Sequence, residues 1–282
     1  MPEVLNQRYH ALKKLAYGQL GTELVGDLIV DIVLRARSLL DTYEHVPLTS
    51  RVVGKRYFGF RSATESRPIN GGLYIQGAQS FHKAMEDFRQ GFPGISSEGV
   101  TKTVYTMASC VLAAHDVNRV GRKASATFFE ILIGHLVARA LGIFPRKKVR
   151  MPESKSELPT DYVFDPGPRS RKIHLPIKTS TRERAVQAWV HQLVLDRIFG
   201  NGEYLGILVV SGETKRNTNT GEVVEICVPR QLQMFQSRVA EISRIYYLDP
   251  PQAYLSLSTG HPRIQVKPFG EAFAELPGLL HH

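Results

Sequence analysis

Apolar residues recur at helical spacing in several long stretches of the chain. Over residues 1–45, leucine, isoleucine and valine return every three or four positions until Pro47, which predicts a helical start. The same spacing predicts further helices over 78–90, 99–115 and 125–141. Ser125 is a suitable N-cap for the last of these, and Gly142 is a suitable C-terminal stop.

In the second half, short apolar runs alternate with helical patterns. Residues 158–164 and 173–178 are two such runs, and the Pro- and Gly-containing turn between them predicts a hairpin. The later pattern predicts a helix over 181–199 and a buried strand over 204–210, which the loop 211–221 joins to a strand over 223–228 as a hairpin. It then predicts a helix over 230–241 and a strand over 243–248. This order predicts an α/β fold with a mixed sheet.

The helical pattern is interrupted near residue 120, where asparagine, arginine, glycine and lysine gather. We therefore predict two domains. The first, 1–120, is mainly helical and serves DNA contacts or oligomerisation, and the second, 121–282, carries the chemistry.

The chain of 282 residues has a formal net charge of +10. Such an excess of positive charge favours polyanions, and nucleic acid is the commonest of these. A basic surface that is merely solvated is the alternative. Between residues 50 and 76, arginines and lysines interleave with aromatic residues, which is typical either of a nucleic-acid contact or of an irregular segment around an aromatic core.

Cysteine usage and hydropathy bear on the compartment. Cys110 and Cys227 are the only cysteines, and both lie in apolar surroundings, which fits a reducing cytoplasm. No stretch approaches the roughly 20 apolar residues of a membrane span, and no secretory signal begins the chain. We therefore expect a cytoplasmic protein without a membrane partner.

The predicted hairpin folds Asp161 and Lys178 back toward each other at one end of the sheet. Glu130 adjoins the apolar stripe of the predicted helix 125–141, where a carboxylate is costly unless it is paired or binds a metal. The alternative is that Glu130 is half exposed and pairs with a lysine or arginine. Carboxylates that hold a divalent metal, with a lysine beside the water, can hydrolyse a phosphodiester. Magnesium suits such all-oxygen ligands.

The segment Asp161 with Pro176-Ile177-Lys178 resembles the PD-(D/E)xK nuclease signature. Thr160 stands where the signature usually has proline, and Pro176 stands where it usually has an acid. The resemblance then implies that Glu130 supplies the displaced acid, with Glu130 and Asp161 as metal ligands and Lys178 as the third catalytic residue. It also implies a restriction-endonuclease-like core.

After Lys178, the triplet Arg182-Glu183-Arg184 is similar to the R-(D/E)-R element of the CCGG family of restriction endonucleases. There the triplet reads C·G pairs in the major groove, and arginine and glutamate suit guanine and cytosine edges. The resemblance implies Mg²⁺-dependent cleavage of double-stranded DNA at a palindrome containing CCGG, cut before the first C to leave a 5′ overhang. A palindrome implies a homodimer or a larger homo-oligomer. Ser180 and Glu183 also fit a capping box, so a structural role of Glu183 stays open.

Two other functions remain open at this point. One is a repair or recombination nuclease of the same superfamily with little sequence preference. The other is a DNA-binding protein without catalysis. The single histidines His135, His174 and His191 are interpreted as core or surface residues, and the role of the loop 211–221 is left open.

Overall fold

The computed structural model describes residues 2–119, 122–152, 156–168, 170–182, 185–259 and 264–280. The helices are α1 (Pro2–Gln19), α2 (Glu23–Leu40), α3 (Ala78–Gln90), α4 (Ser97–Val117), α5 (Arg122–Leu141), α6 (Ala185–Phe199), α7 (Pro229–Arg238), α8 (Gln252–Leu255) and α9 (Ala272–Leu279). Two short 3-10 turns are Ser256–Thr259 and Phe269–Glu271.

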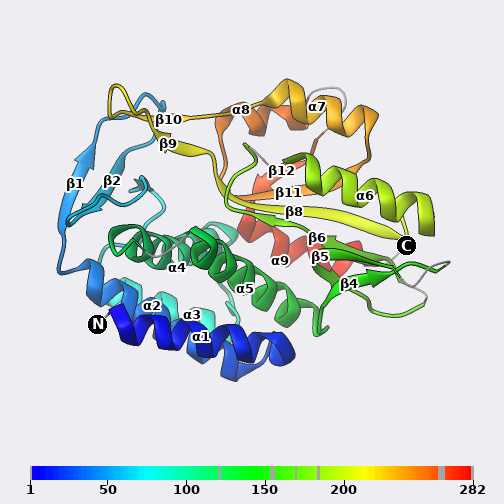
Figure 1. Cartoon of the computed structure of the whole chain (residues 1–282), viewed down its shortest axis with the longest axis horizontal. Helices are drawn as coiled ribbons and strands as arrows, with labels where there is room; N and C mark the ends of the chain where they lie inside the picture. The colour runs from blue at the N-terminus through cyan, green and yellow to red at the C-terminus, as the bar shows by residue number, and fades with distance from the viewer. Residues whose placement is uncertain are drawn as a thin grey trace. The chain divides into compact units, whose positions relative to one another are not determined.

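The strands follow the same chain order (Figure 1). They are β1 (Glu44–Leu48), β2 (Tyr57–Arg61), β3 (Ile69–Asn70), β4 (Arg146–Arg150), β5 (Glu157–Phe164), β6 (Lys172–Leu175), β7 (Ile177–Lys178), β8 (Tyr204–Gly212), β9 (Thr214–Arg216), β10 (Val223–Glu225), β11 (Ile242–Asp249) and β12 (Val266–Pro268).

The chain forms two compact units. The first contains residues 1–136 and 214–226, and the second contains 137–213 and 227–282, so the division falls within α5. The predicted domain boundary near residue 120 stays a prediction.

The first unit is built around the helices α2 and α4. The faces of α2 that carry Ile29, Val30 and Val33 are fully buried, and α4 is buried along almost its whole length. Beside the helices, β1, β2 and β3 form an antiparallel sheet. The hairpin β9–β10 belongs to this unit because Val223 exchanges backbone hydrogen bonds with Thr49 and Arg51, at 2.8 and 3.0 Å.

The second unit contains a mixed sheet with the strand order β12-β11-β8-β6-β5-β4, and β7 pairs with β8. The strands β6, β7 and β11 run parallel to β8, and β5 runs antiparallel to β6 and β4. The strand β8 is buried from Tyr204 to Val210, as expected for a central strand covered on both faces. In Figure 1, β8 and β11 run side by side, with α6 and α7 on one face.

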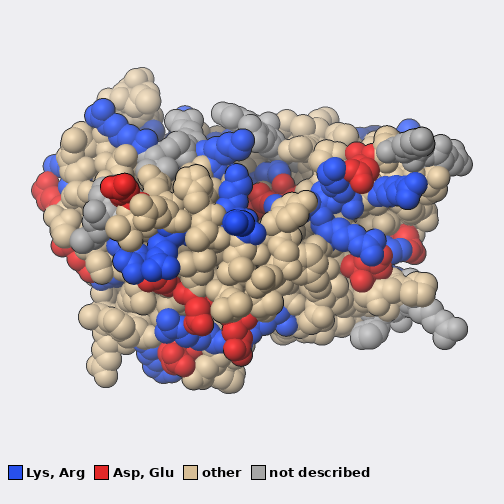
Figure 2. Space-filling view, turned by 60° about the horizontal axis from the view of Figure 1, so that its bottom comes forward, with Lys and Arg blue, Asp and Glu red and all other residues tan. Residues whose placement is uncertain are grey.

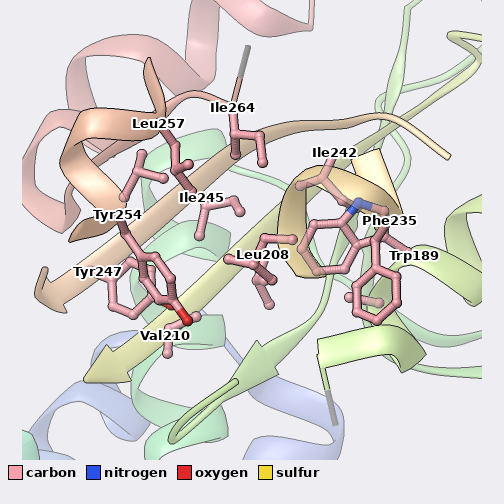
Figure 3. Close-up of a cluster of buried hydrophobic side chains, with 13 residues drawn as sticks. Trp189, Leu208, Val210, Phe235, Ile242, Ile245, Tyr247, Tyr254, Leu257 and Ile264 are labelled. Carbon is pink, nitrogen blue, oxygen red and sulfur yellow. The ribbon is translucent and has the colours of Figure 1, made fainter. Parts of the chain in front are cut away.

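Successive side chains of β11 point to opposite faces of this sheet. Tyr247 joins Trp189 of α6 and Phe235 of α7 in a cluster of buried apolar side chains (Figure 3). On the other face, the hydroxyl of Tyr246 donates to Glu275 of α9 at 2.8 Å. Helices therefore cover the central strands on both sides, and the predicted α/β fold with a mixed sheet is what the structure has.

Most predicted elements exist, and their ends differ in ways that have physical causes. The helix predicted over 125–141 begins at Arg122, so Ser125 lies inside α5. Its hydroxyl is buried and lies 3.1 Å from Nδ1 of His115, so Ser125 joins two helices and does not cap one. Gly142 does end the helix, with a φ of +65° that favours glycine.

Two predicted elements of the second half are corrected. The strand 223–228 does not pair with 204–210, because β10 pairs with β9 while β8 is occupied by β6, β7 and β11. The helix predicted over 181–199 begins at Ala185 in the structure, so Arg182 lies in a turn before α6 and not in its first helical turn.

The expectation that no segment is long and apolar enough to cross a membrane is wrong for one helix. Residues Lys123–Leu141 of α5 meet that condition by length and composition. Most of this stretch is buried inside the protein, as in the core helices of globular proteins.

Candidate functional site

Asp161 and Lys178 lie together at the end of the hairpin, as the sequence predicts. The Nζ atom of Lys178 is 2.9 Å from Oδ2 of Asp161, and the two side chains are 15% and 26% exposed. The same oxygen accepts a hydrogen bond of 2.7 Å from the backbone N–H of Ile177. The carboxylate is thus fixed by a charge and by a backbone donor, and both groups still reach solvent.

Pro176 interrupts the pairing of this strand with β8. Up to Leu175, β6 pairs with both β5 and β8, and a proline has no N–H to continue the ladder. The pairing with β8 resumes in the same register, with Ile177 opposite Val209 and Lys178 opposite Val210. Beyond Leu175 the hydrogen bond to β5 passes instead through the side chain of Asp161.

A cavity of about 140 Å³ lies beside this pair. Its lining includes Asp161, Lys178, Thr160, His174 and His191. The sequence predicts ordinary core or surface positions for these two histidines. His174 is indeed fully buried, but both histidines line the same cavity as the catalytic candidates. The sequence signal for His174 was its place in the same strand run as Lys178, four residues before it.

The hydrogen bonds of Gln192 determine the tautomer of His174. The Nε2 amide of Gln192 donates to Asp196 and to the carbonyl of Tyr204, so its Oε1 is the acceptor for Nδ1–H of His174, at 3.1 Å. Nε2 of His174 is then an acceptor, and it has no hydrogen-bond partner among the described residues. Burial lowers the pKa of His174 to about 4, so the ring is neutral at pH 7. Burial and the charge of Lys178 also lower the pKa of His191.

The oxygens of this site suit a hard divalent cation only in part. Oδ1 of Asp161 has no protein partner in the described ranges, so it is available as a ligand. Glu130 is half-buried on the part of α5 that belongs to the first unit. Burial there raises the pKa of Tyr9, a hydrogen bond with Thr127 opposes that rise, and the charge of Glu130 adds to it. Within the described part of the chain, no group of three His, Cys, Asp or Glu side chains is arranged to hold a metal.

The predicted DNA-reading triplet is described only at its first residue. Arg182 is exposed, and its Nε donates to Oγ of Ser180 at 3.3 Å. Glu183 and Arg184 lie outside the described residues. Thr181, directly before Arg182, is buried and held by Glu213 through its backbone N–H and its hydroxyl, at 2.8 and 2.7 Å. The sequence pattern does not single out Glu213, which falls in the predicted loop 211–221.

The basic and aromatic stretch 50–76 has a packed core. Tyr57, Phe58 and Phe60 are buried, which favours the structural interpretation of these aromatic residues. Arg51 and Lys55 form ion pairs with Glu222 and Glu225, each at 2.7 Å. Figure 2 shows lysine and arginine side chains next to aspartate and glutamate over the visible face. Part of the positive charge is therefore paired within the protein, and the chain keeps a formal net charge of +10.

The mixed sheet, with helices on both faces, Asp161 on β5 and Lys178 on β7, is a restriction-endonuclease fold. The crystal structure of the Type IIP restriction endonuclease Kpn2I is similar to this chain with a TM-score of 0.84. The likeness has 23% sequence identity and covers 98% of this chain and 97% of Kpn2I. The restriction endonuclease PspGI in its complex with substrate DNA aligns with a TM-score of 0.43, at 14% identity over 90% of this chain and 92% of its own.

The likeness to Kpn2I confirms the predicted fold class, and at 23% identity it speaks for the fold alone. The score for PspGI is too low to add to that assignment. No protein-family model matches the sequence, and no curated protein matches it significantly.

Proposed function

We propose that this protein is a type II restriction endonuclease that cleaves double-stranded DNA at a palindromic site containing CCGG. The observation that carries the proposal is the Asp161–Lys178 pair at 2.9 Å, followed four residues after the lysine by the exposed Arg182. A cleavage pair and a base-reading arginine thus share one short segment of a restriction-endonuclease fold. In its motifs the chain looks most like BsaWI, which reads CCGG flanked by A or T, so we propose A or T at the flanks.

In this proposal the three catalytic residues have separate roles. Lys178 orients the water that attacks phosphorus, and Asp161 holds the Nζ atom of Lys178 in place. Asp161 and Glu130 are the metal ligands. Mg²⁺, when bound, supplies charge neutralisation of the phosphate and a more acidic water. The free Oδ1 of Asp161 fits that use, while the part of Glu130 rests on the family resemblance.

The same resemblance supports the remaining parts of the proposal. Arg182, Glu183 and Arg184 read the C·G pairs, since arginine is bidentate to guanine and glutamate accepts from cytosine. Cleavage precedes the first C and leaves a 5′ overhang. Each chain supplies one catalytic lysine, so cleavage of both strands of a palindrome requires a homodimer or larger assembly. We place the enzyme in the bacterial cytoplasm as part of a restriction-modification system.

A digest of one sequenced plasmid tests this proposal. With Mg²⁺ we expect discrete fragments whose ends map to CCGG, and with a chelator no cleavage. A smear would instead indicate a nuclease without sequence preference. Retarded migration of intact DNA in the presence of Mg²⁺ would indicate a binding protein without catalysis.

The active-site assignment is tested with matched lysine variants. Lys178→Ala and Asp161→Ala should abolish cleavage and leave binding of cognate DNA. Lys172→Ala is the control, because Lys172 also pairs with a carboxylate, Glu203, in the same run of strand but does not line the cavity. Cleavage by Lys178→Ala at the rate of Lys172→Ala would refute the assignment. Glu130→Ala is expected to behave as Asp161→Ala does.

A further inference from the structure

Glu213 is a fully buried carboxylate at the end of β8 that the proposed chemistry does not use. Its Oε1 accepts three hydrogen bonds, from the backbone N–H and the hydroxyl of Thr181 and from the hydroxyl of Tyr247 at 3.0 Å. Its Oε2 has no partner among the described residues. All four groups belong to the second unit.

The neighbours of Thr181 are buried as well. Thr181 is 1% exposed, and its hydroxyl lies 3.5 Å from the hydroxyl of Tyr254. That hydroxyl in turn accepts the backbone N–H of Val228 at 2.9 Å. Thr181 is therefore the point where the segment after Lys178 is tied to β8, β11 and α8.

Thr181 lies between Lys178 and Arg182 in the chain, so its contacts affect the segment that joins them. Lys178 is paired with Val210 of β8, and the N–H of Gly212 donates to the carbonyl of Thr179 at 3.3 Å. Glu213 then accepts a hydrogen bond from the backbone N–H of Thr181, the residue directly before Arg182. The end of β8 and the residue after it therefore contact the backbone at three successive points between Lys178 and Arg182.

A buried carboxylate is an unusual residue for holding a backbone segment in place. No described lysine or arginine forms an ion pair with Glu213, and burial raises its pKa against the opposing effects of the Thr181 and Tyr247 hydrogen bonds and the charge of Arg182. Apolar packing usually stabilises a fold at least as well as a buried charge. A carboxylate oxygen, however, can accept several donors and so fix a backbone turn at a chosen angle.

We propose that Glu213 is a positioning residue that fixes the segment 179–182 and thereby aims Arg182 at the DNA bases. This inference rests on the proposed function, and it adds a residue that determines sequence preference without contacting DNA. If the backbone at Thr181 were no longer held, Arg182 would keep its charge but its side chain would no longer be oriented. Preference for the cognate site should therefore fall while non-specific binding stays.

The experiment compares binding to a CCGG duplex and to a scrambled duplex in a magnesium-free buffer, with the full-length protein. The measured quantity is the ratio of the two dissociation constants. For Glu213→Ala we expect this ratio to fall on the order of tenfold, the effect of one lost bidentate base contact. Glu213→Gln should keep it within about threefold, because the amide oxygen still accepts from Thr181.

Glu275→Ala is the matched control. Glu275, like Glu213, is an acid of the second unit that accepts from a tyrosine hydroxyl, although Glu275 is only partly buried. Its donors include Tyr246 and Arg244, the latter at 2.9 Å. It holds α9 and not the segment 179–182. Its loss should lower stability and leave the preference ratio unchanged. An unchanged ratio in Glu213→Ala, with a stability loss like that of Glu275→Ala, would overturn the inference.

Thr181→Val keeps the experiment decisive if Glu213→Ala does not fold. This change removes the hydroxyl donor and preserves the shape and the backbone N–H. We expect the ratio to fall severalfold, and a wild-type ratio would overturn the inference. Failure of the proposed function is recognised separately, since wild-type protein that neither prefers CCGG nor cuts it refutes that function before any variant is compared.

Discussion

Replacing Gln192 by leucine tests the buried hydrogen bonds behind the active-site cavity. Gln192 is 1% exposed and connects α6 to β6 and β8. Its Oε1 accepts from His174, and its Nε2 donates to the carbonyl of Tyr204 at 2.7 Å and to Asp196 at 2.8 Å. In Gln192→Leu, the buried ring of His174 loses its acceptor and the carbonyl of Tyr204 loses a donor.

The expected loss follows from these two buried groups. Leaving a buried donor or acceptor unpaired costs about 1–3 kcal/mol each, so the two together cost about 2–6 kcal/mol. Burying a leucine in place of the amide offsets about 1–2 kcal/mol of this. Asp196 is half exposed, so water replaces its lost bond. We expect the free energy of unfolding to fall by about 3 kcal/mol.

Urea denaturation followed by tryptophan fluorescence measures this change. Trp189 is the only tryptophan of the chain, and it is fully buried in α6, so it reports on the second unit. With a slope of about 1–3 kcal/mol per M, the urea midpoint should fall by about 1–3 M. Gln187→Leu is the control, because Gln187 is an exposed glutamine of the same helix and should change stability by less than about 0.5 kcal/mol. Equal midpoints for the two variants would refute the reasoning.

Three further outcomes are expected. Gly206→Ala should destabilise the second unit by about 1–3 kcal/mol, because an added Cβ would lie 2.7 Å from Gln192 Oε1 and 2.7 Å from Ile242. Gly212→Ala is the control and should be tolerated, because its added Cβ meets its nearest neighbour at 3.6 Å. Equal urea midpoints for the two variants would contradict this prediction. Burial lowers the pKa of His115 from 6.5 to about 4, so the stability it contributes is present above pH 6.5 and is lost as the pH falls toward 4. Between pH 6.5 and pH 4, the free energy of unfolding of His115→Phe should therefore fall by about 3 kcal/mol less than that of wild type. Circular dichroism in urea measures both, and equal losses in the two proteins would contradict the lowered pKa. Finally, with a net charge of +10, binding of non-cognate duplex should weaken steeply with salt; a flat plot of log K against log salt would show that the basic surface does not meet DNA.

The sequence by itself determined the elements whose signals are local. The spacing of apolar residues located α3 at 78–90, and the glycine at 142 marked where α5 stops. Two apolar runs around a Pro-Gly turn determined the β5–β6 hairpin, and with it the approach of Asp161 and Lys178. These features depend on helical and strand periodicity and on turn chemistry, which a few neighbouring residues encode.

Tertiary structure decided what depends on partners distant in the chain. The strand β8 can pair with any strand of matching polarity, and only the assembled sheet places it between β6 and β11 and sends 223–225 to β9. Likewise, the side chain of Glu213 reads as part of a polar loop, yet Thr181 and Tyr247, 32 and 34 residues away, bury it. A hydrogen-bonded acid and a solvated acid have the same local sequence signal, because the energy that separates them comes from the neighbours that the fold supplies.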